Sequence, residues 1–329
     1  MRRVVAACVG TALALGLLAA DPSPVAAQAK VPRVGVISPL DPSASWFADG
    51  LRDGLKELGY VDGKTIALEF RWASGRFDRL PELAAELVRL DVDVIVAGVT
   101  QASLAAKAAT RSIPIVMVGV GDPVAVGLVD SLARPGGNVT GTSTVAVDIV
   151  GKQFELLREL DPNLSRVGVL WNPANQAFQS LQAQQAESAA RASGVALQFF
   201  AVTDPEDLQG TIATLQSANL QTVLILVDPL FTLHRYAIAK RLTDARLIAV
   251  SGVREFAESG GLMAYGASYI HASRRAAIYV DRILKGAKPA ELPVERSDRF
   301  ELVINLRTAR QLGIDIPPAL LARADEVIE

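Results

Sequence analysis

GVGDPVAVGLVDSLARPGGNVTGTST, the stretch at residues 119–144, decides how this chain is organised. It follows an apolar run at 113–118 that is typical of a buried strand. It continues through an Asp-Pro turn, a short predicted helix and a Pro-Gly-Gly break into a Thr- and Ser-rich extended segment. One strand-and-helix half of the chain ends here and another begins. We therefore expect this stretch to form a hinge and to line a cleft between two lobes.

Before this stretch, apolar strand-like runs alternate with segments of helical periodicity. Strands are predicted at 33–37, 65–70, 92–97 and 113–118, and helices at 46–58, 77–89 and 101–110. Thr100 is the predicted N-cap of the last helix. This order of elements favours a parallel sheet with helices on both faces.

After the stretch, the same pattern starts again. The sequence RVGVLWNP at 166–173 echoes RVGVISPL at 33–40, although an echo of this length also arises by chance between two buried strands. Helices are predicted at 151–160, 175–192, 205–216 and 233–242, and further strands at 195–201, 222–227 and 247–251. Two lobes of similar α/β topology are the simplest interpretation.

The C-terminal part adds elements that two plain lobes would not need. A strand-like run at 260–266, a long helix at 272–285 and an extended run at 300–306 suggest two further crossings between the lobes. With the crossing near 139–144, they predict a hinge of three strands. The predicted first lobe is then 30–142 plus 268–297, and the second is 143–267 plus 298–329.

Composition narrows the class of protein. The chain has 329 residues, enough for one large or two medium cores. Its 33 basic and 35 acidic residues give a net charge of −2, so no basic field for nucleic acid is visible. We expect a monomer whose partner is a small molecule.

Residues 1–29 are predicted to be a cleavable export signal. Arg2 and Arg3 precede an apolar run at 4–20 that is too short for a typical membrane anchor. Small residues at 27 and 29 offer a cleavage site, 25–27 is a second choice, and an uncleaved anchor helix is the alternative. Cleavage would place the protein in the periplasm and remove Cys8, the only cysteine, which excludes cysteine catalysis and cysteine metal sites.

The loops after the carboxyl ends of the predicted strands are the expected ligand site, because helix N-termini and their unpaired amides gather there. The candidate residues are Ser38, Thr100, Gln101 and Asp122 in the first lobe, Asn172, Asn175 and Asp228 in the second, and Ser143 and Tyr265 at the hinge. Each also has a local explanation. Asp-Pro pairs begin helices, asparagines favour turns, and Trp46 and Trp171 are more often core than pocket residues.

Signs of catalysis are few. The two histidines, His234 and His271, have no partner at a metal-ligand spacing. No G-x-S-x-G, P-loop or H-E-x-x-H motif is present, and the glycines at 119 and 121 do not continue as a dinucleotide fingerprint. We expect no cofactor, no metal and no enzyme activity.

Five segments carry a resemblance to a known family. They read GDPVAVGLVDSLARPGGNVTG (121–141), RVGVLWNPAN (166–175), GGLMAYGASY (260–269), DRILKGAKPAELPVE (281–295) and FELVINLRTARQLGIDIP (300–317). In this order they resemble ABC-transporter substrate-binding proteins related to the tryptophan and tyrosine uptake binding proteins. The resemblance implies a type I periplasmic-binding-protein fold with two Rossmann-like lobes and a three-strand hinge. It further implies that a ligand closes the lobes and is delivered to a membrane permease driven by a separate ATPase subunit.

The resemblance also implies site residues. The family's cleft positions fall on Thr100, Asp122, Ser143 and Asp228, and less strongly on Asn172, Asn175 and Tyr265, whereas Gln101 stands where relatives often have proline. An amino acid, aromatic or not, or a related metabolite would suit such a site. Its carboxylate would bind near Thr100 and its ammonium near Asp122 or Asp228.

Three other functions are open to a chain of this kind. The alternative to uptake is a periplasmic sensor subunit, which would use the same closure to signal to a receptor. An enzyme on a related scaffold would need the nucleophile, base or metal set that the sequence lacks. A transcriptional regulator would need a DNA-binding element where the export signal stands.

Overall fold

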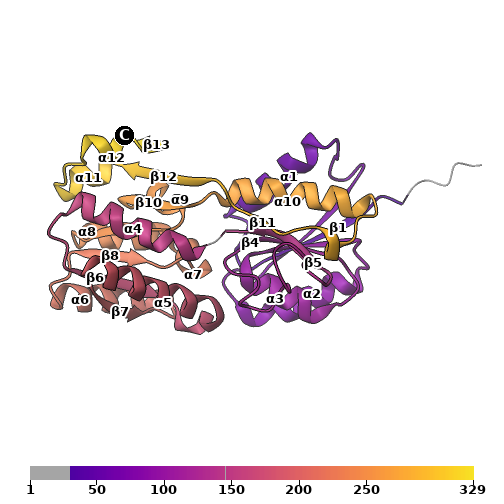
Figure 1. Cartoon of the computed structure of the whole chain (residues 1–329), viewed down its shortest axis with the longest axis horizontal. Coiled ribbons are helices and arrows are strands. Elements are labelled where there is room, and N and C mark those ends of the chain that lie inside the picture. Colours follow the sequence, from indigo (N-terminus) through magenta and orange to yellow (C-terminus); the bar gives the residue numbers. More distant parts are fainter. Residues whose placement is uncertain (1–29, 145) are drawn as a thin grey trace, which may run out of the picture. The chain divides into compact units, whose positions relative to one another are not determined.

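The computed structural model describes residues 30–144 and 146–329 (Figure 1), so the predicted export signal at 1–29 lies outside the described residues. From Val31 onward the chain forms two α/β lobes, each built on its own sheet. The first lobe is the six-stranded sheet with the helices that cover it, and the second lobe is the seven-stranded sheet with its helices. The predicted α/β class is confirmed, with two sheets of mostly parallel strands.

The first sheet is parallel throughout and has the strand order β11-β5-β4-β3-β1-β2. Its strands are β1 (Arg33–Ser38), β2 (Ala67–Trp72), β3 (Val94–Gly98), β4 (Ile115–Val120), β5 (Val139–Ser143) and β11 (Glu295–Arg296). Two helices cover one face, α1 (Ser45–Glu57) and α10 (Tyr269–Leu284), and two cover the other, α2 (Leu80–Arg89) and α3 (Val99–Ala109) (Figure 1). The 3-10 turns η1 (Phe77–Arg79) and η4 (Pro289–Glu291) complete this lobe.

The second sheet has the order β13-β12-β10-β9-β8-β6-β7. Its strands are β6 (Arg166–Trp171), β7 (Ala196–Ala201), β8 (Thr222–Ile225), β9 (Ile248–Ser251), β10 (Met263–Ala267), β12 (Phe300–Asn305) and β13 (Glu326–Ile328). All pairs are parallel except β10 with β12.

Helices pack on both faces of this second sheet. On one side lie α4 (Ala146–Leu160), α5 (Gln176–Ser193), α11 (Leu306–Leu312) and α12 (Pro318–Leu321). On the other lie α6 (Leu208–Ser217), α7 (Pro229–Leu233), α8 (Arg235–Asp244) and α9 (Arg254–Glu258). The 3-10 turns η2 (Pro173–Asn175) and η3 (Pro205–Asp207) precede α5 and α6. No helix in the described ranges has both the length and the apolar character needed to cross a bilayer.

Side chains of the central strands alternate between two cores. In β3, Val94 and Val96 join the core under α1 and α10, whereas Ile95 and Ala97 join the core under α2 and α3. All four are fully buried. A parallel strand covered on both faces is apolar throughout, which is why the sequence shows continuous apolar runs here. Each buried Val or Ile side chain contributes roughly 1.5–3 kcal/mol relative to an exposed one.

The two RVGV segments occupy equivalent places. β1 lies between β3 and β2, and β6 lies between β8 and β7. A Cβ on Gly35 would lie 2.9 Å from the Leu87 side chain of α2, and a Cβ on Gly168 would lie 2.5 Å from the Leu215 side chain of α6. The glycine in each strand lets one helix pack closely on the sheet. The echo is therefore a structural repeat, and the prediction of two lobes of similar topology is confirmed.

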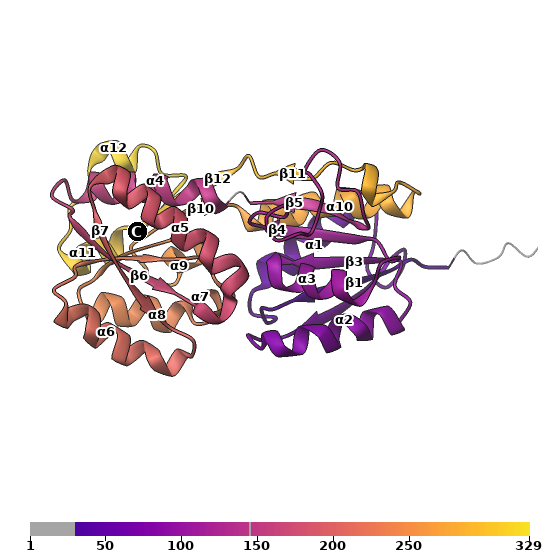
Figure 2. The same cartoon turned by 60° about the horizontal axis from the view of Figure 1, so that its bottom comes forward.

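The chain passes from one sheet to the other at three places (Figure 2), and the first of these includes residue 145, which lies outside the described residues. These connections follow β5, β10 and β11. The Ser297 amide donates to the Ser143 carbonyl at 2.7 Å, and the Ser268 amide donates to the Arg299 carbonyl at 3.0 Å. Because backbone hydrogen bonds join the third connection to each of the others, the three form one hinge.

Two local predictions are wrong. Helix α3 begins at Val99, and no side chain caps it, so Thr100 lies in the first turn instead of at the N-cap. The short helix predicted after Asp122 is a series of turns. The Asp122 carboxylate accepts hydrogen bonds from the amides of Val124 and Ala125 and thereby holds the chain in this turn. Elements α9, β11 and β13 are too short to give a periodic signal.

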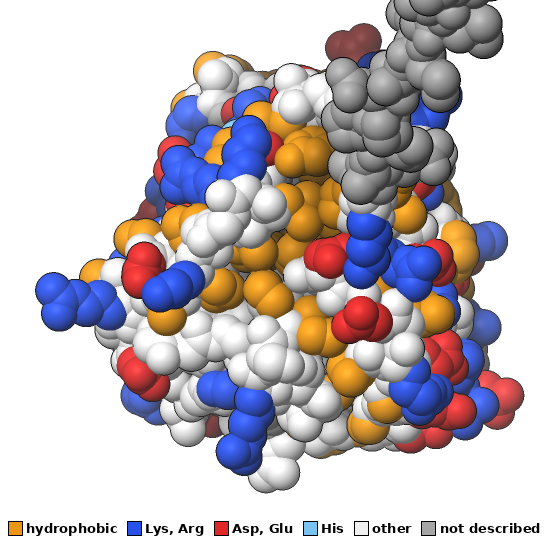
Figure 3. All heavy atoms as spheres, turned by 90° about the vertical axis from the view of Figure 1, so that its right-hand side faces the viewer, with side chains coloured by type: hydrophobic (Ala, Val, Ile, Leu, Met, Phe, Trp, Pro, Cys, Tyr) orange, Lys and Arg blue, Asp and Glu red, His pale blue; other side chains and the backbone are white. Residues whose placement is uncertain are grey.

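The first lobe also carries an apolar hollow on its surface. It lies between the end of α1 and β2 and is lined largely by Leu55, Tyr60, Val61, Ile66 and Leu68. Figure 3 shows hydrophobic side chains gathered in a hollow on the face from which the described chain starts. The hollow lacks the convergent buried polar groups that orient a small ligand, so the candidate site lies elsewhere.

A glycine in β10 tests the packing at the hinge. A Cβ on Gly266 would lie 1.8 Å from the carbonyl oxygen of Gly252, so Gly266→Ala must push two backbone segments apart. We expect the free energy of unfolding of the Gly266→Ala protein to be lower than that of the native protein by about 1–3 kcal/mol in urea denaturation. The control is Gly210→Ala in α6, where no atom lies within 4 Å of the new Cβ and where alanine favours the helix by about 0.5–1 kcal/mol. Equal stability of the two variants would contradict the close approach.

Candidate functional site

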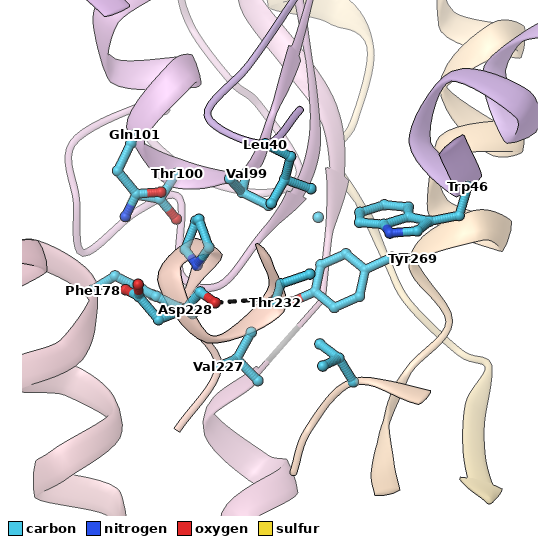
Figure 4. A pocket seen from close by; sticks show the side chains of 13 residues that line it. Leu40, Trp46, Val99, Thr100, Gln101, Phe178, Val227, Asp228, Thr232 and Tyr269 are labelled. Carbon is cyan, nitrogen blue, oxygen red and sulfur yellow. Dashed lines mark hydrogen bonds between the residues drawn. The ribbon is translucent and has the colours of Figure 1, made fainter. Parts of the chain in front are cut away.

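A cavity lies between the lobes, at the carboxyl ends of strands from both sheets (Figure 4). The free space inside the cavity is about 30 Å³ in this structure, within a region of about 410 Å³ that is partly open to solvent. The first lobe contributes Leu40, Trp46, Val99, Thr100, Gln101 and Gly119, the second contributes Phe178, Val227, Asp228, Pro229, Thr232 and Val253, and Tyr269 follows the second hinge connection. This is the edge at which parallel sheets bind ligands.

Asp228 is a carboxylate buried among amide donors. Asp228 is 1% exposed. One carboxylate oxygen accepts from Asn172 Nδ2 at 3.1 Å and from the Leu230 amide at 2.9 Å. The other accepts from Asn175 Nδ2 at 2.7 Å and from Gln179 Nε2 at 3.4 Å. In the described part of the chain, no lysine, arginine or histidine forms an ion pair with Asp228.

Burial raises the pKa of Asp228, and hydrogen bonds from Asn175, Asn172 and the Leu230 amide oppose this rise. The local fold explains the position of the carboxylate, because Asp228 caps α7 and Pro229 follows at the first helical position. A cap alone would leave the carboxylate in water. The two asparagines and Gln179 instead hold it in the cavity wall, where the ammonium group of a ligand would supply the missing charge.

A hydrogen-bond chain crosses the cavity from the first lobe. Gln101 in α3 donates from Nε2 to Asn175 Oδ1, and Asn175 donates from Nδ2 to Asp228. Because Asp228 needs a donor, the amide of Asn175 must turn its oxygen towards Gln101. The side chain of one lobe therefore continues the network that holds the carboxylate of the other.

The start of α3 forms the wall facing Asp228. Val99 has a φ of 56°, a conformation that β-branched residues rarely adopt. Such strain persists only where the surrounding structure imposes it, and it is found preferentially at functional sites. Thr100 is 2% exposed and lies in the first helical turn, where backbone amides lack intrahelical partners. An amide-rich helix start suits a carboxylate.

Aromatic side chains close the cavity near the hinge. The rings of Trp46 and Tyr269 lie 5.5 Å apart between centroids at an interplanar angle of 52°. Gly119, at a φ of 67°, makes room for them, since a Cβ there would lie 2.8 Å from the Tyr269 ring. Burial raises the pKa of Tyr269 to about 12, against the opposing effect of a side-chain hydrogen bond with Thr144. Tyr269 thus lines the cavity and joins two hinge connections.

The nine residues predicted from sequence fall into three groups. Thr100, Gln101 and Asp228 line the cavity. Asn172 and Asn175 lie behind Asp228 and bind its carboxylate. The other four, Ser38, Asp122, Ser143 and Tyr265, are outside the cavity lining.

Those four have structural partners. Ser38 Oγ accepts from the Leu40 amide at 3.2 Å, and Ser143 Oγ donates to the Gly121 carbonyl at 3.0 Å. Asp122 holds its own turn. The Tyr265 ring stacks on Phe300 at 6.4 Å between centroids. Ser38 precedes a lining residue and Ser143 belongs to the hinge, so both support the site from behind.

Sequence reasoning missed most of the aromatic wall. Trp46, an expected core residue, packs against the core and also lines the cavity, and no sequence pattern singles out Phe178 or Tyr269. The feature of the sequence that could have indicated these aromatic residues is the pair of glycines at 119 and 121. A Cβ at Gly119 would meet Tyr269, and a Cβ at Gly121 would lie 2.2 Å from the Phe178 ring. Glycine at such places marks the close approach of a large side chain.

No group of three or more His, Cys, Asp or Glu side chains in the described ranges has an arrangement that could hold a metal ion. The candidate site is therefore described by its carboxylate, its amides and its aromatic rings.

Comparisons with known proteins agree with this geometry. The profile of a family described as ABC transporter substrate binding protein matches residues 33–328. A tyrosine-binding protein of Clostridioides difficile (strain R20291) is 27% identical over 274 residues, which cover 83% of this chain and 78% of that protein.

Among solved structures, a conserved domain protein from Vibrio cholerae is 30% identical with a TM-score of 0.84, over 91% of this chain and 100% of the other. An ABC domain from Streptococcus pneumoniae in complex with L-Trp is 27% identical with a TM-score of 0.82, over 90% and 99%. The ligand-free, open structure of a substrate-binding protein with adhesive properties from Clostridium difficile is 25% identical with a TM-score of 0.67, over 91% and 99%.

The burial of Asp228 predicts a pH-dependent effect of Asp228→Asn on the stability of the ligand-free protein. Because the folded-state pKa is raised above 3.8, the folded protein binds this proton more tightly than the unfolded chain does. Ionisation of Asp228 therefore lowers the stability of the native protein as pH rises through the folded-state pKa. We expect the stability of the variant relative to the native protein to rise as pH rises from about 4 towards neutral, in urea denaturation at each pH.

The matched control is Asp204→Asn, which replaces an exposed capping carboxylate at η3. Its stability difference from the native protein should vary much less over the same range. A difference for Asp228→Asn that shrinks as pH rises would contradict the unfavourable burial of this carboxylate.

Proposed function

The chain belongs to the ABC transporter substrate-binding protein family, and on that premise we propose that it captures an α-amino acid, with aromatic side chains preferred, between its lobes for uptake. In this proposal residues 30–142 plus 268–297 form one lobe and 143–267 plus 298–329 the other. The protein acts as an exported monomer in the periplasm. It releases the ligand to a membrane permease, which a separate ATPase subunit drives.

The observation that carries the proposal is the uncompensated Asp228 carboxylate. Burying a charge without a counterion is costly, and amide donors offset only part of that cost. The ammonium group of an amino acid would restore charge balance and add charge-assisted hydrogen bonds. A neutral sugar would leave the carboxylate unpaired, so the site favours a cationic group at this end.

The wall formed by the start of α3 suits the carboxylate of an amino acid, which is bonded to the same Cα as the ammonium. The first turn of α3, at Val99 to Gln101, offers unpaired amides and the Thr100 hydroxyl to a carboxylate. Between the two walls lie Trp46, Phe178 and Tyr269, together with aliphatic side chains. Aromatic walls favour an aromatic ligand side chain. Two relatives agree with this class, since one is a tyrosine-binding protein and another was solved with L-Trp.

Closure of the lobes is the proposed mechanism of capture. A ligand that touches both walls favours the closed state by its additional contacts there. The Gln101 to Asn175 hydrogen bond, which joins the lobes directly, would form only on closure. The chain also superposes better on the L-Trp complex than on the open, ligand-free relative, although both are similarly distant in sequence. The family supports uptake rather than the sensor alternative, and binding rather than turnover.

The ligand assignment is tested by isothermal titration of L-tyrosine, L-tryptophan and other L-amino acids. We expect at least one aromatic amino acid to bind the native protein and Asp228→Asn to weaken it by about 10²–10³-fold, because one charge of a buried pair is lost. Asp122→Asn is the control, since this carboxylate lies outside the cavity lining, and its affinity should stay within about twofold. Equal losses in both variants would contradict the role given to Asp228, and no binding of any amino acid would contradict the function.

Closure is tested by small-angle X-ray scattering of the same complexes. We expect the radius of gyration to fall when ligand is added. Gln101→Ala should weaken binding by about 2–10-fold, because one net hydrogen bond of the closed state is lost. Lys107→Ala, on the same helix, is the control, because Lys107 donates only to carbonyls of its own lobe. An unchanged radius on ligand binding would contradict capture by closure.

A further inference from the structure

Trp46 carries a buried polar group that the protein itself does not satisfy. Its indole Nε1 is buried and has no hydrogen-bond partner among the described residues. The ring packs against Phe47 at 6.0 Å and Tyr269 at 5.5 Å between centroids, so its orientation is held by neighbours on two sides. A buried donor without a partner destabilises the ligand-free protein, and a ligand acceptor that reached it would remove that cost.

Apart from the Thr100 hydroxyl, which the proposed function assigns to the ligand carboxylate, the other polar side chains of the cavity are already engaged. Gln101 donates to Asn175, and the Asp228 carboxylate accepts from several amides. The Thr232 hydroxyl donates to the Asp228 carbonyl at 3.1 Å, and Tyr269 bonds with Thr144. Trp46 is thus the side-chain donor of this wall that a ligand can still satisfy.

The position of Trp46 determines which end of the ligand it meets. Figure 4 shows Trp46 and Asp228 on opposite sides of the cavity, with Tyr269 beside the indole. Trp46 also lines a second, more polar cavity together with Arg235, Glu255 and Glu258. A ligand whose ammonium binds Asp228 can therefore extend its side chain towards Trp46.

We propose that Trp46 determines specificity: its Nε1–H donates to an acceptor atom at the tip of the ligand side chain. An indole N–H can only donate, so it favours ligands that carry a hydrogen-bond acceptor at this position. The phenolic oxygen of tyrosine provides that acceptor. Phenylalanine has no polar atom there, and tryptophan presents a second donor. The inference rests on the proposed function, because it assumes that an amino acid occupies the cavity with its ammonium at Asp228.

The size of the expected preference for tyrosine follows from what phenylalanine would leave unpaired. When phenylalanine fills the cavity, the indole N–H stays buried and unpaired and water is excluded from it. Sites built to bind a hydroxyl group reject the analogue that lacks it far more strongly than they reject a missing methylene. We expect a preference for L-tyrosine over L-phenylalanine of at least about tenfold, with L-tryptophan also weaker than L-tyrosine.

The test compares dissociation constants of L-tyrosine, L-phenylalanine and L-tryptophan for the native protein and for Trp46→Phe by isothermal titration. The variant keeps an aromatic ring near Tyr269 and removes the donor together with part of the ring volume, and the loss of volume affects all three ligands. L-tyrosine should lose about tenfold more in affinity than L-phenylalanine does, so their ratio should fall to within about threefold. Retained L-phenylalanine binding shows that the site is intact. Trp171→Phe, whose ring packs on Phe199 outside the cavity, should keep the native ratio.

The native ratio alone can overturn the inference, without any substitution. Equal affinity for L-tyrosine and L-phenylalanine would exclude a specificity role for Trp46 and leave amino-acid capture standing. A preference that survives in Trp46→Phe would assign the selection to another residue. Failure of every amino acid to bind the native protein would instead overturn the proposed function and this inference with it.

Discussion

The site depends on a carboxylate that the fold buries without a counterion. Asp228 reaches its place because a parallel strand ends there and a short helix begins, which is an ordinary event in an α/β lobe. Asn172 and Asn175 convert this cap into a buried anion by orienting two amides towards it. That arrangement is poor for the stability of the ligand-free protein and good for recognition. The unpaired charge of Asp228 thus raises the free energy of the ligand-free protein, and binding of a cationic group would lower it.

The hinge and the cavity share residues, so a ligand in the cavity would contact the segments about which the proposed closure turns. Tyr269 follows one connection, bonds with Thr144 after another, and lines the cavity. Gly119 lets its ring approach the sheet. Gln101 adds a direct bond from the first lobe to the network around Asp228. Tyr269 lies in the cavity and at the hinge, so a ligand bound beside it can act on the hinge directly. Ligand binding and closure of the lobes therefore need no long chain of residues to couple them.

Sequence patterns predict the fold well and the candidate site in part, for different physical reasons. Buried parallel strands need continuous apolar runs, so the repeat of RVGV at 33–36 and 166–169 can be recognised in the linear sequence. Asp228 can be recognised too, since a strand followed by Asp-Pro marks a loop at the ligand edge. Thr100 is predicted in the right loop with the wrong local role, because Val99 adopts a left-handed conformation that no propensity favours.

By itself, the sequence determined the two α/β lobes, their crossings and the loops that face each other, because these follow from the period and order of apolar residues along the chain. Only the tertiary structure decided which polar residues reach the cavity and which merely hold their own turns, as Asp122 does. It also brought Trp46, Phe178 and Tyr269 into one aromatic wall. These three lie far apart in the chain and have no shared local pattern. Their meeting depends on how two lobes face each other across a hinge, which local sequence does not encode.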